Sequence, residues 1–295
     1  MSRTATPRQG RVLVGYDGSE HSLRALDRAA DEAARRGTGL EVLCGWPWGR
    51  NLVPESVMRC GDGQVLHEQA GLAMKRAVIR VHRRAPGLSV TPTLTVEAPA
   101  RALVRSGHSA CLTVLGSRGH GGFAGLLLGS VTLRVAAHTT SPLLVVRDDV
   151  RGTRRSVLVG VESDADTDAL RFGFEEAVRL GADLRVLHAW QYPASPGPQP
   201  PGPLFRDDVR VLAKAAEAVP EFAVAPLRDA YPGVRVRTEA LCTGAGHALT
   251  EASREADVVV IAAHRASSRL GLQLGPVTHA VLHHAHCPVV LVPTG

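Results

Sequence analysis

The chain is an internal duplication, and this feature constrains its fold more than any other. Three segments of the first half each have a counterpart in the second half. The paired segments are RVLVGYDG (11–18) with SVLVGVES (156–163), LTVLGSRGHGGFAGLLLGSVT (112–132) with VVVIAAHRASSRLGLQLGPVT (258–278), and TTSPLLVVR (139–147) with AHCPVVLVP (285–293). Self-similarity at a fixed spacing indicates repeated structural units. The sequence therefore predicts two domains of one kind, 1–150 and 151–295, joined near DDVRGTRR.

Each copy alternates short apolar runs with amphipathic segments. In the first copy the runs that favour strands are 12–16, 40–45, 90–96, 111–115 and 143–147, and the segments that favour helices are 19–36, 64–85, 99–107 and 131–138. Gly37 is expected to end the first helix as a C-terminal cap. Strands that alternate with helices predict a parallel sheet covered on both faces. Open sheets of this kind bind ligands at the carboxyl ends of the strands, where the strand order reverses.

Composition excludes several classes of protein. The net charge of +6 comes from 34 basic and 28 acidic scattered residues, and aromatic residues are only 4% of the chain. Few side chains are therefore available to stack on nucleic-acid bases. The segment MSRTATPRQG lacks the apolar core of a signal peptide, and no apolar stretch approaches the ~18–20 residues of a membrane helix. The five cysteines are widely spaced without a CxxC motif, as expected of reduced thiols. We therefore expect a cytoplasmic protein that binds neither nucleic acid nor membranes.

The stretch VLGSRGHGGFAGLLLGS (114–130), here called the glycine turn, lies between a predicted strand and a predicted helix. Gly116, Gly119, Gly129 and Ser130 give it the spacing G-x2-G-x9-G-S. Glycines allow backbone N–H groups to approach an anion closely. Ser130 is expected at the N-cap of the next helix, whose free N–H groups favour a phosphate. The turn therefore predicts a phosphate site, and a flexible turn without a ligand is the alternative.

Asp17 follows the first predicted strand directly. Its carboxylate could accept hydrogen bonds from ribose hydroxyls or hold a metal ion that is bound to phosphate. The alternative is a helix cap formed together with Gly18 and Ser19. The first and fourth strands should be neighbours across the point where the order reverses. We therefore expect Asp17 to lie opposite the glycine turn, in the same crevice.

The motif DGS (17–19), the G-x2-G-x9-G-S spacing and SPLLVVR (141–147) together resemble the universal stress protein family, over nearly all of both copies. The resemblance implies two tandem open parallel-sheet α/β domains with strand order 3-2-1-4-5, related by a pseudo-two-fold axis. It also implies that ATP, with Mg²⁺, binds to copies that carry the glycine spacing. One departure is VEAPARAL, where Glu97 and Ala98 precede the proline that opens the third helix and members of the family often have glycine.

The resemblance assigns roles to residues of the first copy. Asp17 would contact the ribose or the metal ion, and the backbone at Gly45 would meet the adenine. The remaining residues would surround the ribose and the phosphates. The complete set of predicted binding residues is Gly15, Asp17, Gly45, Leu115, Gly116, Arg118, Gly119, His120, Gly129, Ser130 and Val131.

The second copy keeps the fold pattern but changes the predicted site. Gly116 corresponds to Ala262, Gly119 to Arg265, Ser130 to Pro276 and Asp17 to Glu162, while Gly129 is retained as Gly275. A proline at the helix start removes both a side-chain acceptor and a backbone N–H. We therefore expect one ATP site per chain, in the first copy.

Three functions remain open at this point. The sequence favours an ATP-binding regulatory protein of the stress response. A slow ATP hydrolase or a phosphoryl or adenylyl transferase ranks second, because no clear nucleophile or general base stands beside the predicted phosphate site and His120 is the only obvious base in the glycine turn. A nucleotide-independent interaction scaffold is the third alternative. His279 and His283 are spaced as a helical pair that could chelate a metal ion, but ordinary polar positions are favoured.

Each copy ends in an apolar run, Leu143–Arg147 in the first and Val289–Val292 in the second. An apolar strand at the edge of a sheet tends to be paired or covered. The two runs are therefore expected to pair antiparallel within one chain, which leaves a homodimer of whole chains open.

Overall fold

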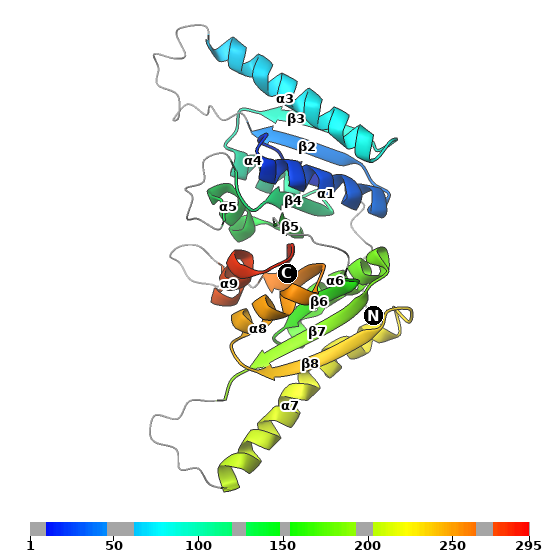
Figure 1. Cartoon of the computed structure of the whole chain (residues 1–295), viewed down its shortest axis with the longest axis vertical. Helices are drawn as coiled ribbons and strands as arrows, with labels where there is room; N and C mark the ends of the chain where they lie inside the picture. The colour runs from blue at the N-terminus through cyan, green and yellow to red at the C-terminus, as the bar shows by residue number, and fades with distance from the viewer. Residues whose placement is uncertain are drawn as a thin grey trace. The chain divides into compact units, whose positions relative to one another are not determined.

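The computed structural model describes residues 10–45, 62–119, 128–147, 154–192, 203–263 and 274–294. It divides into two compact units, Met1–Asp148 and Asp149–Gly295. Each unit contains five parallel strands with helices packed against them (Figure 1). Within the described residues, no helix is both long enough and apolar enough to cross a membrane.

The first unit alternates strands and helices along the chain. Its elements are β1 (Val12–Gly15), α1 (Glu20–Arg36), β2 (Leu40–Gly45), α3 (Asp62–Arg84), β3 (Val90–Thr95), α4 (Pro99–Gly107), β4 (Leu112–Gly116), α5 (Ser130–His138) and β5 (Leu143–Val146). The strand order is β3-β2-β1-β4-β5, and neighbouring strands are parallel. This is the order implied by the family resemblance, and the prediction is confirmed.

Helices cover both faces of the first sheet. The three consecutive residues Val12, Leu13 and Val14 are fully buried, although successive side chains of a strand point to opposite faces. Both faces of β1 must therefore be covered, as is typical of parallel sheets. Helix α1 packs beside α3, while α4 packs beside α5.

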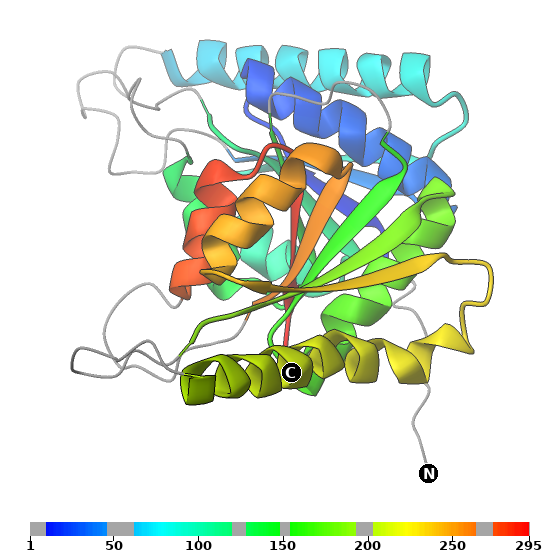
Figure 2. The same cartoon turned by 60° about the horizontal axis from the view of Figure 1, so that its bottom comes forward.

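The second unit repeats this plan. Its elements are β6 (Ser156–Val161), a 3-10 turn (Asp164–Asp166), α6 (Thr167–Leu180), β7 (Asp183–Trp190), α7 (Pro203–Arg228), β8 (Val236–Cys242), α8 (Ala245–Ala252), a second 3-10 turn (Ser253–Glu255), β9 (Val258–Ala263), α9 (Pro276–His284) and β10 (Val289–Pro293). The strand order is β8-β7-β6-β9-β10, again with parallel neighbours. In Figure 2, α8 and α9 lie on the opposite side of this sheet from α7.

The first helix of each unit ends at a glycine. Gly37 follows α1 with a φ of 62°, and Gly181 follows α6 with a φ of 58°. Residues other than glycine rarely adopt these left-handed angles. The backbone N–H of each glycine donates to carbonyls of the last helical turn, as expected of a C-terminal cap. The predicted end of the first helix at Gly37 is thereby confirmed.

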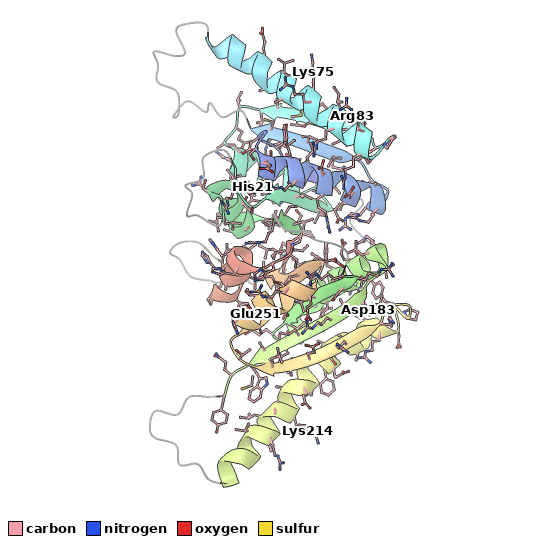
Figure 3. All side chains as sticks on the ribbon, in the orientation of Figure 1. His21, Lys75, Arg83, Asp183, Lys214 and Glu251 are labelled. Atoms are coloured by element: carbon pink, nitrogen blue, oxygen red, sulfur yellow. The ribbon has the colours of Figure 1, made fainter. Side chains whose placement is uncertain are left out.

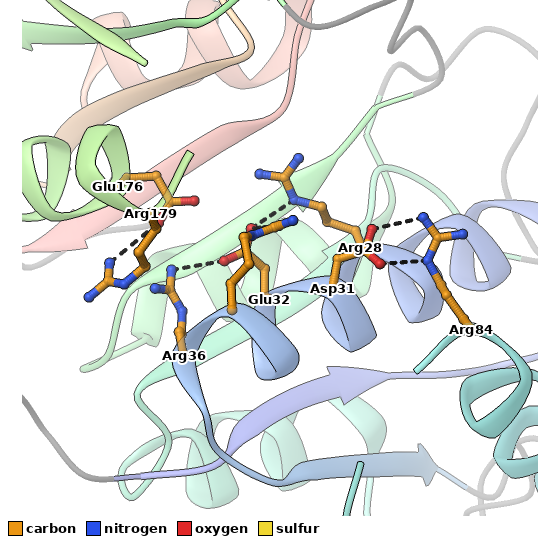
Figure 4. Close-up of polar contacts among 8 residues, drawn as sticks. Arg28, Asp31, Glu32, Arg36, Arg84, Glu176 and Arg179 are labelled. Carbon is orange, nitrogen blue, oxygen red and sulfur yellow. Dashed lines mark hydrogen bonds and ion pairs between the residues drawn. The ribbon is translucent and has the colours of Figure 1, made fainter. Parts of the chain in front are cut away.

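A cluster of charged residues lies along the last two turns of α1 (Figure 4). The Glu32 side chain is fully buried and forms ion pairs with Arg28 at 2.9 Å, Arg35 at 2.7 Å and Arg36 at 3.0 Å. Burial alone would raise the pKa of this carboxyl, but the three guanidinium groups outweigh it and hold the pKa below its ordinary value. Glu32 therefore stays ionised in the folded protein and compensates the charge of its neighbours.

The variant Glu32→Gln should be destabilised by about 1.5–3 kcal/mol at pH 7, because it removes the buried carboxylate that pairs with three partly exposed guanidinium groups. The folded pKa of Glu32 lies below the unfolded value near 4.5, so its stabilisation is fully present above that pH and declines as the pH falls further. The difference between wild type and variant should accordingly shrink below pH 4.5. Urea unfolding at a series of pH values measures both effects.

Glu20→Gln is the matched control on the same helix. Glu20 pairs with Arg24 at 2.6 Å, but its side chain is largely exposed. Exposed pairs contribute about 0–1 kcal/mol, so this variant should change the urea midpoint little. Equal effects of the two substitutions would contradict the role assigned to Glu32.

Candidate functional site

The turn after β1 holds Asp17 in a defined position. The Oδ1 atom of Asp17 accepts a hydrogen bond from the Ser19 N–H at 2.9 Å, across Gly18, whose φ is 84°. Ser19 is the N-cap of α1, and its Oγ accepts from the Ser22 N–H at 3.2 Å. Asp17 therefore shapes the turn, while Ser19 caps the helix. The other carboxylate oxygen of Asp17, Oδ2, faces Gly119.

The two ends of the glycine turn are fixed to the sheet. The Ser117 N–H donates to the Val146 carbonyl at 3.0 Å, and the Gly129 N–H donates to the Ser117 carbonyl at 2.7 Å. The Thr132 hydroxyl donates to the Gly116 carbonyl at 2.9 Å. Residues 117 and 129 are thus held together at the carboxyl end of β4, and α5 begins there. The loop between them is closed by hydrogen bonds that need no ligand.

The N-terminus of α5 differs from the prediction in one detail. Gly129, with extended backbone angles, is the N-cap, and Ser130 is the first helical residue. The expectation that Ser130 is the N-cap is therefore wrong, because the chain turns into the helix one residue earlier. No side-chain hydrogen bond caps this end among the described residues. Within the described residues the first N–H groups of α5 therefore have no side-chain acceptor, and the helix dipole favours an anion there.

Several glycines of the predicted site are required by packing within the protein. A Cβ on Gly116 would lie 2.7 Å from the His21 carbonyl oxygen, in the first turn of α1. A Cβ on Gly45 would lie 2.5 Å from the Pro99 ring, and one on Gly15 would lie 2.5 Å from the Leu115 side chain. These three glycines therefore allow helices and strands to approach one another. They do not by themselves indicate a ligand.

Gly119 and Gly129 have a different environment. A Cβ on Gly119 would lie 2.6 Å from Asp17 Oδ2, so a side chain there would displace the carboxylate. A Cβ on Gly129 would be 3.4 Å from the Arg118 Cα and 3.7 Å from the Gly119 nitrogen. The structure thus brings Asp17, Gly119 and Gly129 together, as the strand order predicts. At this point a carboxylate lies against bare backbone.

Arg118 lies in the same part of the glycine turn. Its side chain is half-buried, and the buried Nε atom makes no hydrogen bond within the described part of the chain. A buried donor without an acceptor is costly and requires an explanation. An anion bound beside Arg118 would supply the missing acceptor.

Tyr16 and Cys44 lie at the carboxyl ends of β1 and β2, near Asp17, and both side chains are buried. Burial raises the pKa of Tyr16, and the Cys44 and Asp17 side chains raise it further. Burial also raises the pKa of the Cys44 thiol, with a second contribution from Asp17. Both groups are therefore neutral near pH 7.

Sequence reasoning missed some residues that build the site. The His21 ring lies 3.4 Å from the Ser117 hydroxyl, and Thr132 holds the end of β4. Neither contact follows from spacing along the chain, because each joins residues of different elements. His120 lies outside the described residues. Among the described residues, no group of three or more histidine, cysteine, aspartate or glutamate side chains could hold a metal ion.

The corresponding end of the second sheet is built differently. Asp166 is buried, and its Oδ2 accepts the Glu162 N–H at 2.6 Å and the Ser163 N–H at 3.4 Å. The backbone donors after β6 are therefore satisfied by a side chain of the same unit. Gly275 is the N-cap of α9 and Pro276 follows it. Ala262 is buried at the end of β9, while Arg265 lies outside the described residues.

These features define a doubly wound α/β protein in which Asp17, Gly119 and Gly129 meet where the strand order reverses. The chain belongs to the universal stress protein family, whose sequence model matches residues 9–147 and 153–293. It is 30% identical to a universal stress protein of Mycolicibacterium smegmatis over 295 residues, which span 95% of this chain and 96% of the relative. It is 28% identical over 310 residues to a universal stress protein of Mycobacterium tuberculosis, with 96% and 97% of the two chains covered.

A solved structure agrees in fold. The crystal structure of a universal stress protein from Archaeoglobus fulgidus matches with a TM-score of 0.67 at 17% identity, covering 97% of this chain and 100% of that one. The family model and the relative from Mycolicibacterium smegmatis confirm the family resemblance identified in the sequence.

Gly116→Ala and Gly129→Ala should have unequal effects on stability. The first places a Cβ against the backbone of α1 and should cost at least about 1–3 kcal/mol, as overpacked cores do. The second meets no atom closer than 3.4 Å and should change stability much less. Urea unfolding of the two variants decides the point. Equal losses would mean that Gly116 does not hold α1 against β4.

Proposed function

We propose that this protein binds ATP in its first unit and acts as a nucleotide-dependent regulator in a stress response. The observation that carries the proposal is the meeting of Asp17, Gly119 and the uncapped N-terminus of α5 at one point of the sheet edge. At a topological switch point, a carboxylate fits the ribose of a nucleotide or its magnesium ion, and a set of backbone donors fits its phosphates.

The phosphates would lie against the start of α5. The N–H groups of Ser130 and Val131 belong to the first turn of the helix, where the helix dipole favours negative charge. The bare backbone of Gly119 and Gly129 permits a close approach, and Arg118 supplies a half-buried cation. Together these groups compensate the charge of a polyphosphate without any additional basic cluster.

The Asp17 carboxylate would bind the ribose or a magnesium ion. One of its oxygens is used by the turn and the other faces the crevice at Gly119. Mg²⁺ is commonly bound by one or two carboxylates together with substrate phosphates. A single carboxylate facing a phosphate site fits that pattern, so Asp17 would hold the ion with the phosphates of ATP. The ion would neutralise phosphate charge. The adenine would lie beyond Gly45, at the end of β2.

ATP binding ranks above ATP hydrolysis in this proposal. His120, the base that hydrolysis would use, lies outside the described residues, so the geometry gives hydrolysis no support. Turnover of ATP by protein in large deficit would establish an enzyme instead. Gently purified protein should release ATP on denaturation, identified by mass spectrometry. Absence of released nucleotide together with absence of binding in calorimetry would favour the nucleotide-independent scaffold.

Gly119→Ala and Ser130→Ala should each weaken ATP binding and leave the fold intact. The alanine at 119 displaces Asp17 Oδ2, and Ser130→Ala removes a hydroxyl at the start of α5. Loss of one hydrogen bond to a charged group costs about 1.5–3 kcal/mol, or roughly ten- to a hundredfold in affinity. Titration calorimetry measures the change, and circular dichroism confirms folding.

Gly275→Ala and Pro276→Ala are the matched controls, at the corresponding positions of the second unit. A Cβ on Gly275 would meet no atom within 4 Å. Both controls should bind ATP as wild type does. If Gly119→Ala and Ser130→Ala also keep full affinity, the nucleotide does not bind beside the glycine turn.

Titration should give one tight ATP site per chain. In the second unit Pro276 replaces Ser130 at the helix start, Arg265 replaces Gly119 and Ala262 replaces Gly116. Losing several phosphate contacts should lower the affinity well over a hundredfold. A stoichiometry near two would contradict this expectation. Asp166→Ala, which frees the donors of the second unit, should still leave the ratio near one because the proline remains.

The pairing of Leu143–Arg147 with Val289–Val292 within one chain stays a prediction, as does the pseudo-two-fold relation of the two units. Cytoplasmic localisation also stays a prediction.

A further inference from the structure

Helix α7 carries an apolar stripe on its outer surface. The stripe consists of Val211, Ala215, Ala218, Phe222 and Ala225, and is here called the outer stripe. Their spacing of four, three, four and three residues places them on one face of a helix. Val211 is 68% exposed and Phe222 is 75% exposed.

The outer stripe lies opposite the face that attaches α7 to its sheet. That inner face contains the buried residues Ala216, Ala223, Val224 and Leu227, and α7 packs with it against β7 and β8. Successive residues of a helix differ by 100°, which puts the two sets on opposite sides of the axis. The fold of the unit therefore does not need Phe222 or Val211. A contiguous apolar row of this kind marks an interaction surface.

The outer stripe is complementary to a second copy of itself. In an antiparallel pair of α7 helices that cross near Ala218, each Phe222 would pack against the small side chains of Ala215 and Ala218 of the other copy. A large side chain then fills the space that alanines leave, which is the condition for close helix packing. Such an isologous contact uses the same surface on both chains, so the assembly stops at a dimer.

Charge on the flank of the outer stripe agrees with this pairing. Lys214 and Glu221 lie on the same side of the stripe, and both are exposed (Lys214 is labelled in Figure 3). In an antiparallel pair, the same flank of each helix meets that of its partner, so Lys214 of one copy faces Glu221 of the other. Glu221 also pairs with Arg228 at 3.1 Å within its own helix and accepts a hydrogen bond from the Thr238 hydroxyl of β8, while about half of its side chain stays exposed. Two symmetric opposite-charge contacts would thus border the apolar seam.

Helix α3 of the first unit also exposes Leu72 and Ile79 on its outer face, but it differs from α7 at the position of Phe222. The turns Pro86–Gly87 and Pro232–Gly233 mark equivalent helix ends, and by this register Arg76 takes the place of Phe222. A guanidinium at that point would have to be desolvated in the seam, which is costly. The outer face of α3 therefore does not offer the same contact.

We propose that the outer stripe of α7 is a homodimer interface, in which two chains pack antiparallel about a two-fold axis near Ala218. A single pair of helices buries less than the ~1,200 Å² of a standard interface, so the association should be reversible and dependent on concentration. The interface does not include the proposed ATP site, and its formation should not require nucleotide.

Sedimentation equilibrium of the full chain between ~1 and ~500 µM tests the proposal. Wild type should show a monomer–dimer equilibrium, and Phe222→Glu should raise the dissociation constant at least tenfold, as expected when an aromatic anchor is removed. Ile79→Glu is the matched control, because it makes the same change at an apolar, half-exposed position on the outer face of α3. The control should dimerise as wild type does.

Cross-linking distinguishes this interface from any other. Ala218→Cys lies near the proposed axis and should give a disulfide-linked dimer on mild oxidation, with the 218–218 link identified by mass spectrometry. Leu72→Cys, at the equivalent position of α3, and the wild type should not give a link at that site. A protein that stays monomeric at all concentrations would overturn the proposal. A dimer that survives Phe222→Glu and gives no 218–218 link would overturn it as well.

Discussion

The close approach of α1 to the end of β4 is the constraint on which the first unit depends. Gly116 has no room for a Cβ because the first turn of α1 lies directly against it, with the His21 carbonyl oxygen 2.7 Å from where that atom would be. This contact brings the turn after β1 beside the turn after β4, and Asp17 consequently faces Gly119. The polar crevice is therefore a consequence of how tightly one helix packs on the two central strands.

The second unit keeps the same strand order with an alanine in place of this glycine. Ala262 stands where the first unit has Gly116, and α6 is preceded by a 3-10 turn that α1 lacks. In that turn Asp166 accepts the N–H groups after β6 and is itself buried. The start of the helix and the end of the fourth strand have thus both changed, as expected where one packing contact couples them. The unit conserves its apolar core, while the N–H groups after β6 are bound by its own Asp166 carboxylate.

Much of the architecture could be predicted from the sequence, because strands and helices leave periodic patterns. The apolar run at Val12–Gly15 and the glycine at 37 fix the first strand and the end of the first helix by local rules. The order of the strands followed from a family resemblance. What could not be predicted were contacts between elements. The sequence suggested that Gly45 and Gly116 serve a ligand, whereas Pro99 and His21 occupy the space beside them. The N-cap was also placed at Ser130 instead of Gly129, since both residue types are common at that position.

The outermost helix is attached to its neighbour by different forces in the two units. In the first unit, Arg80 and Arg84 of α3 form paired hydrogen bonds with Asp27 and Asp31 of α1. In the second, Phe174 of α6 stacks on Tyr231, just beyond α7, with ring centroids 5.2 Å apart.

Exposed ion pairs contribute little to stability and are screened by salt, whereas a buried aromatic contact is both stronger and insensitive to salt. With α7 held from its inner side by apolar packing, its outer surface needs no charge to stabilise the fold. The outer face of α7 carries Val211 and Phe222, and that of α3 carries Leu72 and Ile79, so neither mode of attachment uses the outer surface of its helix.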